Sequence, residues 1–278
     1  MLLQSDLIGT HPILPNIFAK WLTCIDIPVT ISKSHRSLSS LLPNNDNDLI
    51  DWLGRKLFEH HHNSDRTEKL KERYIKLGYP EYAEQHRKLP RVDKVKKGNA
   101  TEILLIEYIQ ASVNKELYHA YKLRYNPNVD QAIKGDDTLM VDICNINGID
   151  NIKLYLGEAK FRKTPSKTVV DTISKFLSKD KRPLSYSFLV DELGRDPKTK
   201  SIADILEAFI VEEIKGTGDL IYTGFLLSNT DVFRVVELNL NSDNPQMILI
   251  SIGINNPDVL IDEAFKKAEY FYANPDKL

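Results

Sequence analysis

Acidic residues and a lysine stand at the ends of two short apolar stretches in the middle of the chain. Asp136 and Asp137 precede the first stretch, and Glu158-Ala159-Lys160 closes the second. Side chains of a strand alternate between two faces, so Glu158 and Lys160 share one face and Ala159 lies on the other. Two carboxylates and an ammonium group on one face can hold a divalent cation and orient a water molecule for attack on a phosphodiester.

A β-hairpin is the element that would bring these groups together. Residues 134–143 and 153–161 carry the alternating apolar pattern of strands, and residues 147–150, Asn-Gly-Ile-Asp, are typical of a turn between them. When the chain folds back at this turn, Asp137 comes near the Glu-Ala-Lys end of the second strand. The sequence therefore predicts one charged site on two paired strands.

A buried helix is expected to add a third carboxylate. The helix is predicted to begin near Gly98, and residues 103–109 are apolar on most sides. Glu102 lies in its first turn, where a glutamate ordinarily complements the helix dipole. Because this helix precedes the two strands and leans on their sheet, we expect Glu102 to face the same metal ion; Glu107 is the weaker candidate.

Basic residues surround a predicted helix directly after the second strand. They include Arg162, Lys163 and Lys167, and Lys134 stands just before the first strand. Residues 65–97 form another basic stretch with interleaved tyrosines, which fits either a solvated helical hairpin or a surface that follows a phosphate backbone. Cations beside a carboxylate cluster suit a polyanion such as DNA better than a sugar or a peptide.

Composition excludes several other classes of protein. A net charge of −2 and a hydrophobic content of 42% are those of an ordinary globular chain, and no signal peptide or membrane-spanning run is visible. The two cysteines, Cys24 and Cys144, lie far apart and fit a reducing cytoplasm. No Gly-rich phosphate loop appears, so any ATP-driven step must come from another chain. Residues 60–62, three histidines, are expected to form a solvated helix end.

The fold predicted from these patterns is α/β, with a mixed central sheet flanked by helices. Residues 1–97 are taken as an N-terminal accessory region with a basic helical connector, and residues 98–278 as the domain that carries the site. The expected strands are residues 116–125, 184–190, 220–227, 232–240 and 247–254 in addition to the hairpin. The expected helices include residues 38–42, 49–58, 201–215 and a final one from residue 258.

The ordered set of a glutamate helix, an Asp strand, a turn, a Glu-X-Lys strand and a basic helix resembles the PD-(D/E)XK nuclease superfamily over residues 98–190. That resemblance implies a restriction-endonuclease-like core. Two sequence segments are similar, more specifically, to the HamA family of the Hachiman anti-phage defence system. They are Lys134-Gly135-Asp136-Asp137 and Gly157-Glu158-Ala159-Lys160-Phe161.

The resemblance implies a role for each residue of the site. Asp137 and Glu158 would ligate Mg²⁺ or Mn²⁺ together with the Ala159 carbonyl, and Lys160 would orient the attacking water. Glu102 would be an outer ligand. Asp136 stays an alternative to Asp137, because a register shift of one residue moves every side chain of a strand to the opposite face.

The same resemblance implies a metal-dependent DNA endonuclease, the effector of a defence complex controlled by a HamB-like helicase. A stand-alone restriction or repair nuclease is one alternative. Another is a nuclease-like fold that binds nucleic acid or serves as a scaffold without catalysis. The intact Asp137, Glu158 and Lys160 count against the non-catalytic alternative.

Overall fold

The structure is a computed structural model of the whole chain. It describes residues 2–81, 89–126, 128–132, 135–146, 149–209 and 219–277. Within these ranges no helix has the length and apolar character needed to cross a lipid bilayer.

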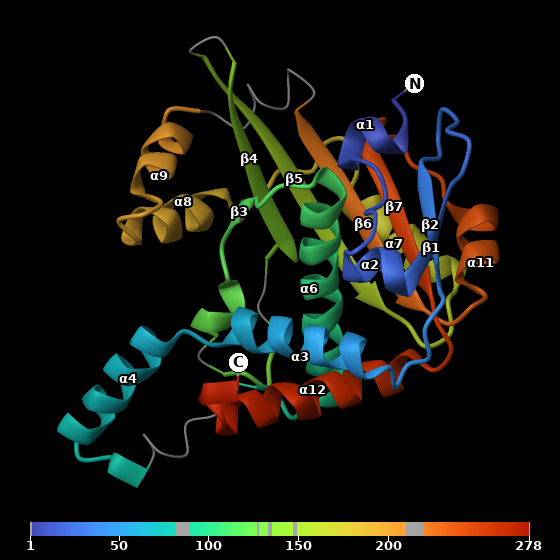
Figure 1. Cartoon of the computed structure of the whole chain (residues 1–278). Helices are drawn as coiled ribbons and strands as arrows, with labels where there is room; N and C mark the ends of the chain where they lie inside the picture. Colours follow the sequence, from blue (N-terminus) through green and yellow to red (C-terminus); the bar gives the residue numbers. More distant parts are fainter. Residues whose placement is uncertain are drawn as a thin grey trace.

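A mixed β-sheet runs through the middle of the molecule (Figure 1). Its seven strands in the described ranges are, in sheet order, β1 (Leu22–Asp26), β2 (His35–Ser40), β7 (Met247–Gly253), β6 (Leu220–Ser228), β5 (Ile149–Phe161), β4 (Thr138–Ile146) and β3 (Tyr118–His119). The four central strands, β2, β7, β6 and β5, are parallel to one another. β1, β4 and β3 add antiparallel edges. The mixed central sheet predicted from the sequence is confirmed.

Helices cover both faces of the sheet (Figure 1). One apolar core contains residues from α1 (Gln4–Ile8), α2 (Ile17–Trp21), α3 (Asn47–His61), α6 (Asp93–Val113) and α12 (Pro257–Ala273). A second core on the opposite face contains residues from α7 (Lys167–Phe176), α8 (Tyr186–Arg195), α9 (Lys200–Glu207) and α11 (Val232–Asn239). α4 (Ser64–Lys76) projects away from the body, and the short 3₁₀ helices η1 (Lys122–Tyr125) and η2 (Pro275–Lys277) complete the described elements.

The predicted hairpin is present as β4 and β5. Thr138 pairs with Gly157 and Asp142 with Lys153 in an antiparallel register, so the start of β4 lies beside the end of β5. The predicted strands 220–227 and 247–254 are also confirmed, as β6 and β7. Every residue of both strands is buried, as expected for parallel strands with helices on both sides. The centre of the turn, residues 147 and 148, lies outside the described residues.

The predicted boundary between residues 97 and 98 falls inside a helix. α6 begins at Asp93 and runs through that point without a break. β1 and β2, from the N-terminal region, extend the same sheet through parallel pairing of β2 with β7. The N-terminal region therefore forms part of the sheet that carries the site.

Four predicted elements were wrong. Residues 38–42 fall partly in strand β2, and only Tyr118–His119 of the predicted strand 116–125 pairs with β4. The predicted strands 184–190 and 232–240 correspond to helices α8 and α11. Their buried residues recur at helical spacing, with Leu189 and Leu193 four positions apart in α8 and Val232 and Val236 four apart in α11.

Candidate functional site

The hairpin brings Asp137, Glu158 and Lys160 together where β4 begins and β5 ends. The ammonium Nζ of Lys160 lies 3.4 Å from Asp137 Oδ2 and also contacts Glu158 Oε1. The backbone N–H of Ala159 donates a hydrogen bond to Asp137 Oδ2 at 2.9 Å. The aspartate is thus tied to the end of β5, and the two carboxylates share one ammonium group.

Burial and like charge perturb this group of side chains. Glu158 is only 4% exposed, and its burial, followed by the negative charge of Asp137, raises the pKa of Glu158 to about 7. Burial acts to lower the pKa of Lys160, but the charges and hydrogen bonds of Asp137 and Glu158 raise it above its ordinary value. Lys160 is therefore charged at neutral pH and only partly relieves the repulsion between the two carboxylates.

Glu102 lies within electrostatic reach of the same groups. Its carboxylate oxygen Oε2 lies 2.8 Å from Lys122 Nζ, and only 16% of its side chain is exposed. Burial raises the pKa of Glu102 to about 7; the charge of Lys122 lowers it and the charge of Asp137 raises it. The predicted convergence of the glutamate helix on the hairpin is thus present in the structure.

Asp136 faces a different environment from Asp137. Its carboxylate Oδ2 accepts hydrogen bonds from the backbone N–H and the hydroxyl of Ser185, both at 2.9 Å. Lys181 Nζ lies 3.1 Å from the other oxygen, and the Asp136 side chain is fully buried. These partners hold Asp136 against the segment before α8, so Asp137 is the aspartate that faces Glu158.

A cavity of about 40 Å³ adjoins the site. Glu102, Asp137 and Lys122 line it together with His60 and His119. This volume has room for only a few water molecules, since each needs roughly 10–15 Å³.

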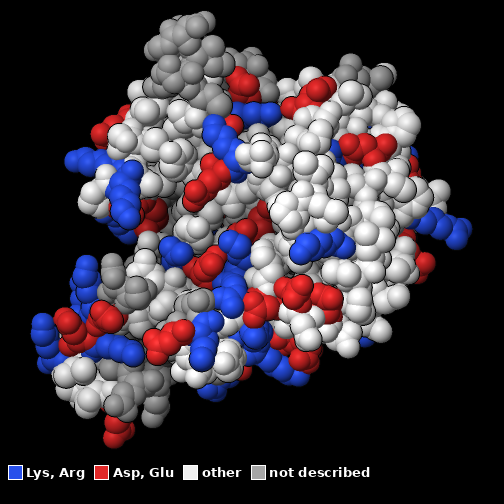
Figure 2. Space-filling model, in the orientation of Figure 1, with Lys and Arg blue, Asp and Glu red and all other residues white. Residues whose placement is uncertain are grey.

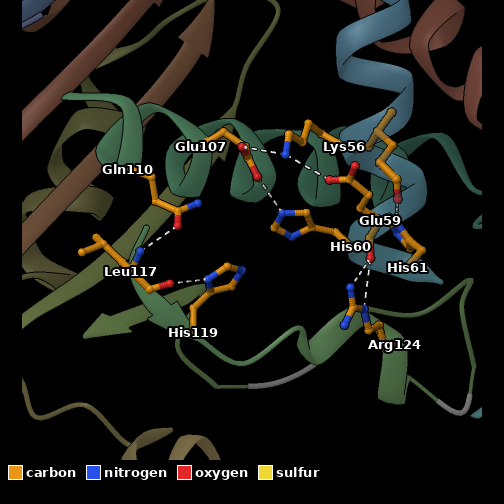
Figure 3. Close-up of polar contacts among 10 residues, drawn as sticks. Lys56, Glu59, His60, His61, Glu107, Gln110, Leu117, His119 and Arg124 are labelled. Carbon is orange, nitrogen blue, oxygen red and sulfur yellow. Dashed lines mark hydrogen bonds and ion pairs between the residues drawn. The ribbon is translucent and has the colours of Figure 1, made fainter. Parts of the chain in front are cut away.

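Two of the three histidines predicted to form a solvated helix end, His60 and His61, are buried instead, and His62 is half-buried. His60 and His61 are 3% and 2% exposed, because α3 packs them against α6 (Figure 3). His60 Nε2 lies 3.0 Å from Glu107 Oε1, and His61 Nδ1 donates to the Leu57 carbonyl at 2.7 Å. Glu107 therefore joins α6 to α3, and this pairing leaves Glu102 as the glutamate of α6 beside the hairpin.

The predicted DNA-binding residues lie on the surface after β5. Lys163 and Lys167 have side chains 68% and 67% exposed, and each lies near an acid: Lys163 Nζ is 3.3 Å from Asp258 Oδ2, and Lys167 Nζ is 2.5 Å from Asp171 Oδ2. Arg162 is exposed and donates to the carbonyl of Phe161 at 2.9 Å. Lys134 lies outside the described residues. Figure 2 shows Lys and Arg interspersed with Asp and Glu over α4, so the basic stretch of the sequence does not form a purely basic surface there.

The ligand chemistry of the site fits Mg²⁺. In the part of the chain that the structure describes, no three side chains of His, Cys, Asp or Glu converge to hold a metal ion by themselves. Mg²⁺, however, is usually bound through one or two carboxylates and keeps several waters. Asp137 and Glu158 supply two carboxylates whose mutual repulsion a divalent cation would relieve.

Sequence reasoning missed Lys122 and Ser185. Both fall in segments predicted to be strands or their borders, and neither belongs to a motif. A lysine outside the hairpin gives no signal by spacing alone. Only the fold places Lys122 next to Glu102 and Ser185 next to Asp136.

Fold and site together define a mixed α/β protein with a cluster of carboxylates and lysines at the end of a central hairpin. The family model for HamA matches residues 15–268. The chain is also 37% identical to the Hachiman protein HamA of Bacillus cereus over 277 residues, which cover 97% of this chain and 96% of the relative. The chain belongs to the HamA family.

Proposed function

We propose that this protein is a metal-dependent DNA endonuclease with a PD-(D/E)XK-type core. The observation that carries the proposal is the convergence of Asp137, Glu158 and Lys160 at the end of the hairpin. A buried carboxylate beside a half-buried one, with one shared ammonium group, is costly to maintain for stability alone. Such costs are typical of functional sites.

Asp137 and Glu158, with the carbonyl oxygen of Ala159, would hold Mg²⁺ or Mn²⁺. When bound, the metal ion would polarise the scissile phosphate and lower the pKa of a coordinated water. The hydrogen bond from the Ala159 N–H to Asp137 fixes the orientation of that carboxylate. Its position is therefore set before any ligand arrives, which reduces the reorganisation needed for catalysis.

Lys160 and Glu102 would serve the chemistry beside this carboxylate pair. The ammonium group of Lys160 can hydrogen-bond the attacking water and stabilise negative charge at the phosphate. Because its neighbours raise its pKa, Lys160 acts as a charged donor at neutral pH. Glu102, whose pKa is about 7, can accept a proton from a water molecule in the adjoining cavity.

DNA is the substrate that the surroundings favour. The exposed cations Arg162, Lys163 and Lys167 directly follow the strand that carries Glu158 and Lys160. They could contact the phosphates on either side of the scissile bond and so set the register of the strand. Lys163 and Lys167 pair with Asp258 and Asp171, so a DNA phosphate would have to displace these two acids.

Membership of the HamA family supports a place in a Hachiman anti-phage defence complex. A HamB-like helicase would be the partner that supplies ATP-driven work, since this chain has no phosphate-binding loop motif of its own. Control by a partner protects the host from a nuclease that cuts its own DNA. Two widely spaced cysteines agree with a cytoplasmic location.

Alanine substitutions at the site test this function. Glu158→Ala and Lys160→Ala should each abolish Mg²⁺-dependent cleavage of DNA, measured with the chain alone and with the helicase of its own system. Lys115→Ala is the matched control, because Lys115 also pairs with a carboxylate of β4, Asp142, but outside the site. Cleavage by both site variants at the wild-type rate would show that the site is misassigned.

A further inference from the structure

Lys122 lies between two parts of the site that the sequence motif does not connect. Its Nζ is 2.8 Å from Glu102 Oε2 on α6. The same ammonium group donates a hydrogen bond to the backbone carbonyl of Asp136 at 3.1 Å. That carbonyl belongs to the peptide group from which Asp137 continues. One side chain thus joins the glutamate helix to the residue that begins the hairpin site.

The short helix η1, which carries Lys122, is itself fixed to α3. Arg124 Nε and Nη2 both donate to the carbonyl of Glu59, at 3.0 and 2.7 Å (Figure 3). The guanidinium carbon of Arg124 also lies 3.6 Å from the centre of the Tyr121 ring, within the range of a cation–π interaction. Flanked by these contacts, Lys122 keeps a side chain only 18% exposed. A half-buried lysine held in this way has little freedom to leave its two partners.

We propose that Lys122 is a positioning residue of the site: its ammonium group couples the Glu102 carboxylate to the peptide that carries Asp137. The effect on catalysis rests on the nuclease function proposed above. The contact of Lys122 with Glu102 and with the Asp136 carbonyl is a property of the folded chain and does not depend on that function. Lys122 would act through Asp137 and Glu102.

The geometry gives two reasons why loss of Lys122 would displace Asp137. Asp137 precedes the first paired residue of β4, Thr138, and so lies outside the strand ladder. The segment that carries Asp137 therefore depends on side-chain contacts for its position, and the hydrogen bond from Lys122 to the Asp136 carbonyl is one of them. In addition, without Lys122 the buried Glu102 carboxylate would lose its nearest cation and repel Asp137 more strongly.

The amide of Ala159 reports on the position of Asp137. Its N–H donates to the Asp137 carboxylate, so displacement of this side chain exposes the amide to solvent. In Lys122→Met we expect hydrogen exchange of the Ala159 amide, followed by NMR on the intact protein, to be at least tenfold faster. With saturating Mg²⁺ and DNA, kcat should fall at least tenfold while KM for DNA changes less than twofold.

Lys56→Met is the matched control. Lys56 is also a half-buried lysine paired with a glutamate of α6: its Nζ lies 3.4 Å from Glu107 Oε2, and 28% of its side chain is exposed. This variant should lose comparable stability, but exchange at Ala159 and kcat should stay within twofold of the wild type. If Lys122→Met fails to fold, Lys122→Gln keeps a neutral donor and should show the same changes at a smaller amplitude.

The outcomes separate this proposal from the proposed function. Unchanged exchange at Ala159 in a folded Lys122 variant overturns the positioning role, whether or not the protein cuts DNA. If exchange at Ala159 is faster in the Lys122 variant but the wild type cuts no DNA, the positioning of Asp137 is supported and the nuclease function is refuted. Faster exchange together with a lower kcat supports both.

Discussion

Glu158→Gln should make the metal-free protein more stable at pH 8. Glu158 is almost completely buried, and burial together with the charge of Asp137 raises its pKa from 4.5 to about 7. The ionised side chain is therefore held in a place that favours its neutral form. Glutamine has nearly the same shape and carries no charge, so it removes the unfavourable charge without opening a cavity.

The sign and size of the effect follow from the linkage between protonation and folding. Because the pKa is higher in the folded state, the folded protein binds this proton more tightly than the unfolded chain, and stability falls as pH rises from 4.5 through 7. A rise of the pKa from 4.5 to about 7 corresponds to about 3–4 kcal/mol, at about 1.4 kcal/mol per tenfold change in the ionisation constant. Relaxation of the protein and entry of water around a buried charge lower such penalties in real proteins, so the expected gain is about 2 kcal/mol.

Urea unfolding with EDTA present measures this gain. The free energies of unfolding of wild type and Glu158→Gln should agree at pH 4.5 and differ by about 2 kcal/mol at pH 8. Glu263→Gln, on an exposed glutamate of α12, should follow the wild type at both pH values. If Glu158→Gln is no more stable than the wild type at pH 8, burial and the charge of Asp137 do not disfavour the ionised form of Glu158, and the reasoning is wrong.

Two further predictions concern the approach of the strands and the approach of DNA. A Cβ on Gly157 would lie 2.0 Å from Thr138 Oγ1 and 2.6 Å from Leu105 Cδ2; Gly157→Ala should thus cost about 1–3 kcal/mol in urea unfolding, and stability equal to wild type would show that β4 can shift freely. Charge reversal at both Lys163 and Lys167 should weaken DNA binding and flatten its dependence on salt, because fewer counterions are released. A salt slope equal to that of the wild type would remove these two residues from the proposed DNA-binding surface.

The hairpin could be predicted because its information is local. Alternating apolar residues, a turn between them and the period of two were enough to place Asp137 near Glu158 and Lys160, as the structure confirms. β6 and β7 were recognisable for a similar reason, since strands buried on both faces are continuous apolar runs.

Other features could not be predicted because contacts between distant segments decide them. Short apolar runs such as residues 232–240 suit a strand or a helix equally well, and packing against the sheet selected the helix. The histidines of α3 appeared to end a solvated helix, yet α6 and its Glu107 cover His60. The choice between Asp136 and Asp137 likewise depended on Ser185, about fifty positions further along the chain.

The sequence by itself determined that a carboxylate pair and a lysine would meet at one end of a hairpin, because strand period and turn chemistry act over neighbouring residues. The tertiary structure alone decided how this site is completed. It placed Lys122 against Glu102 and the peptide before Asp137, and it joined the N-terminal strands to the same sheet. These contacts join residues distant in sequence, and no periodic pattern records them.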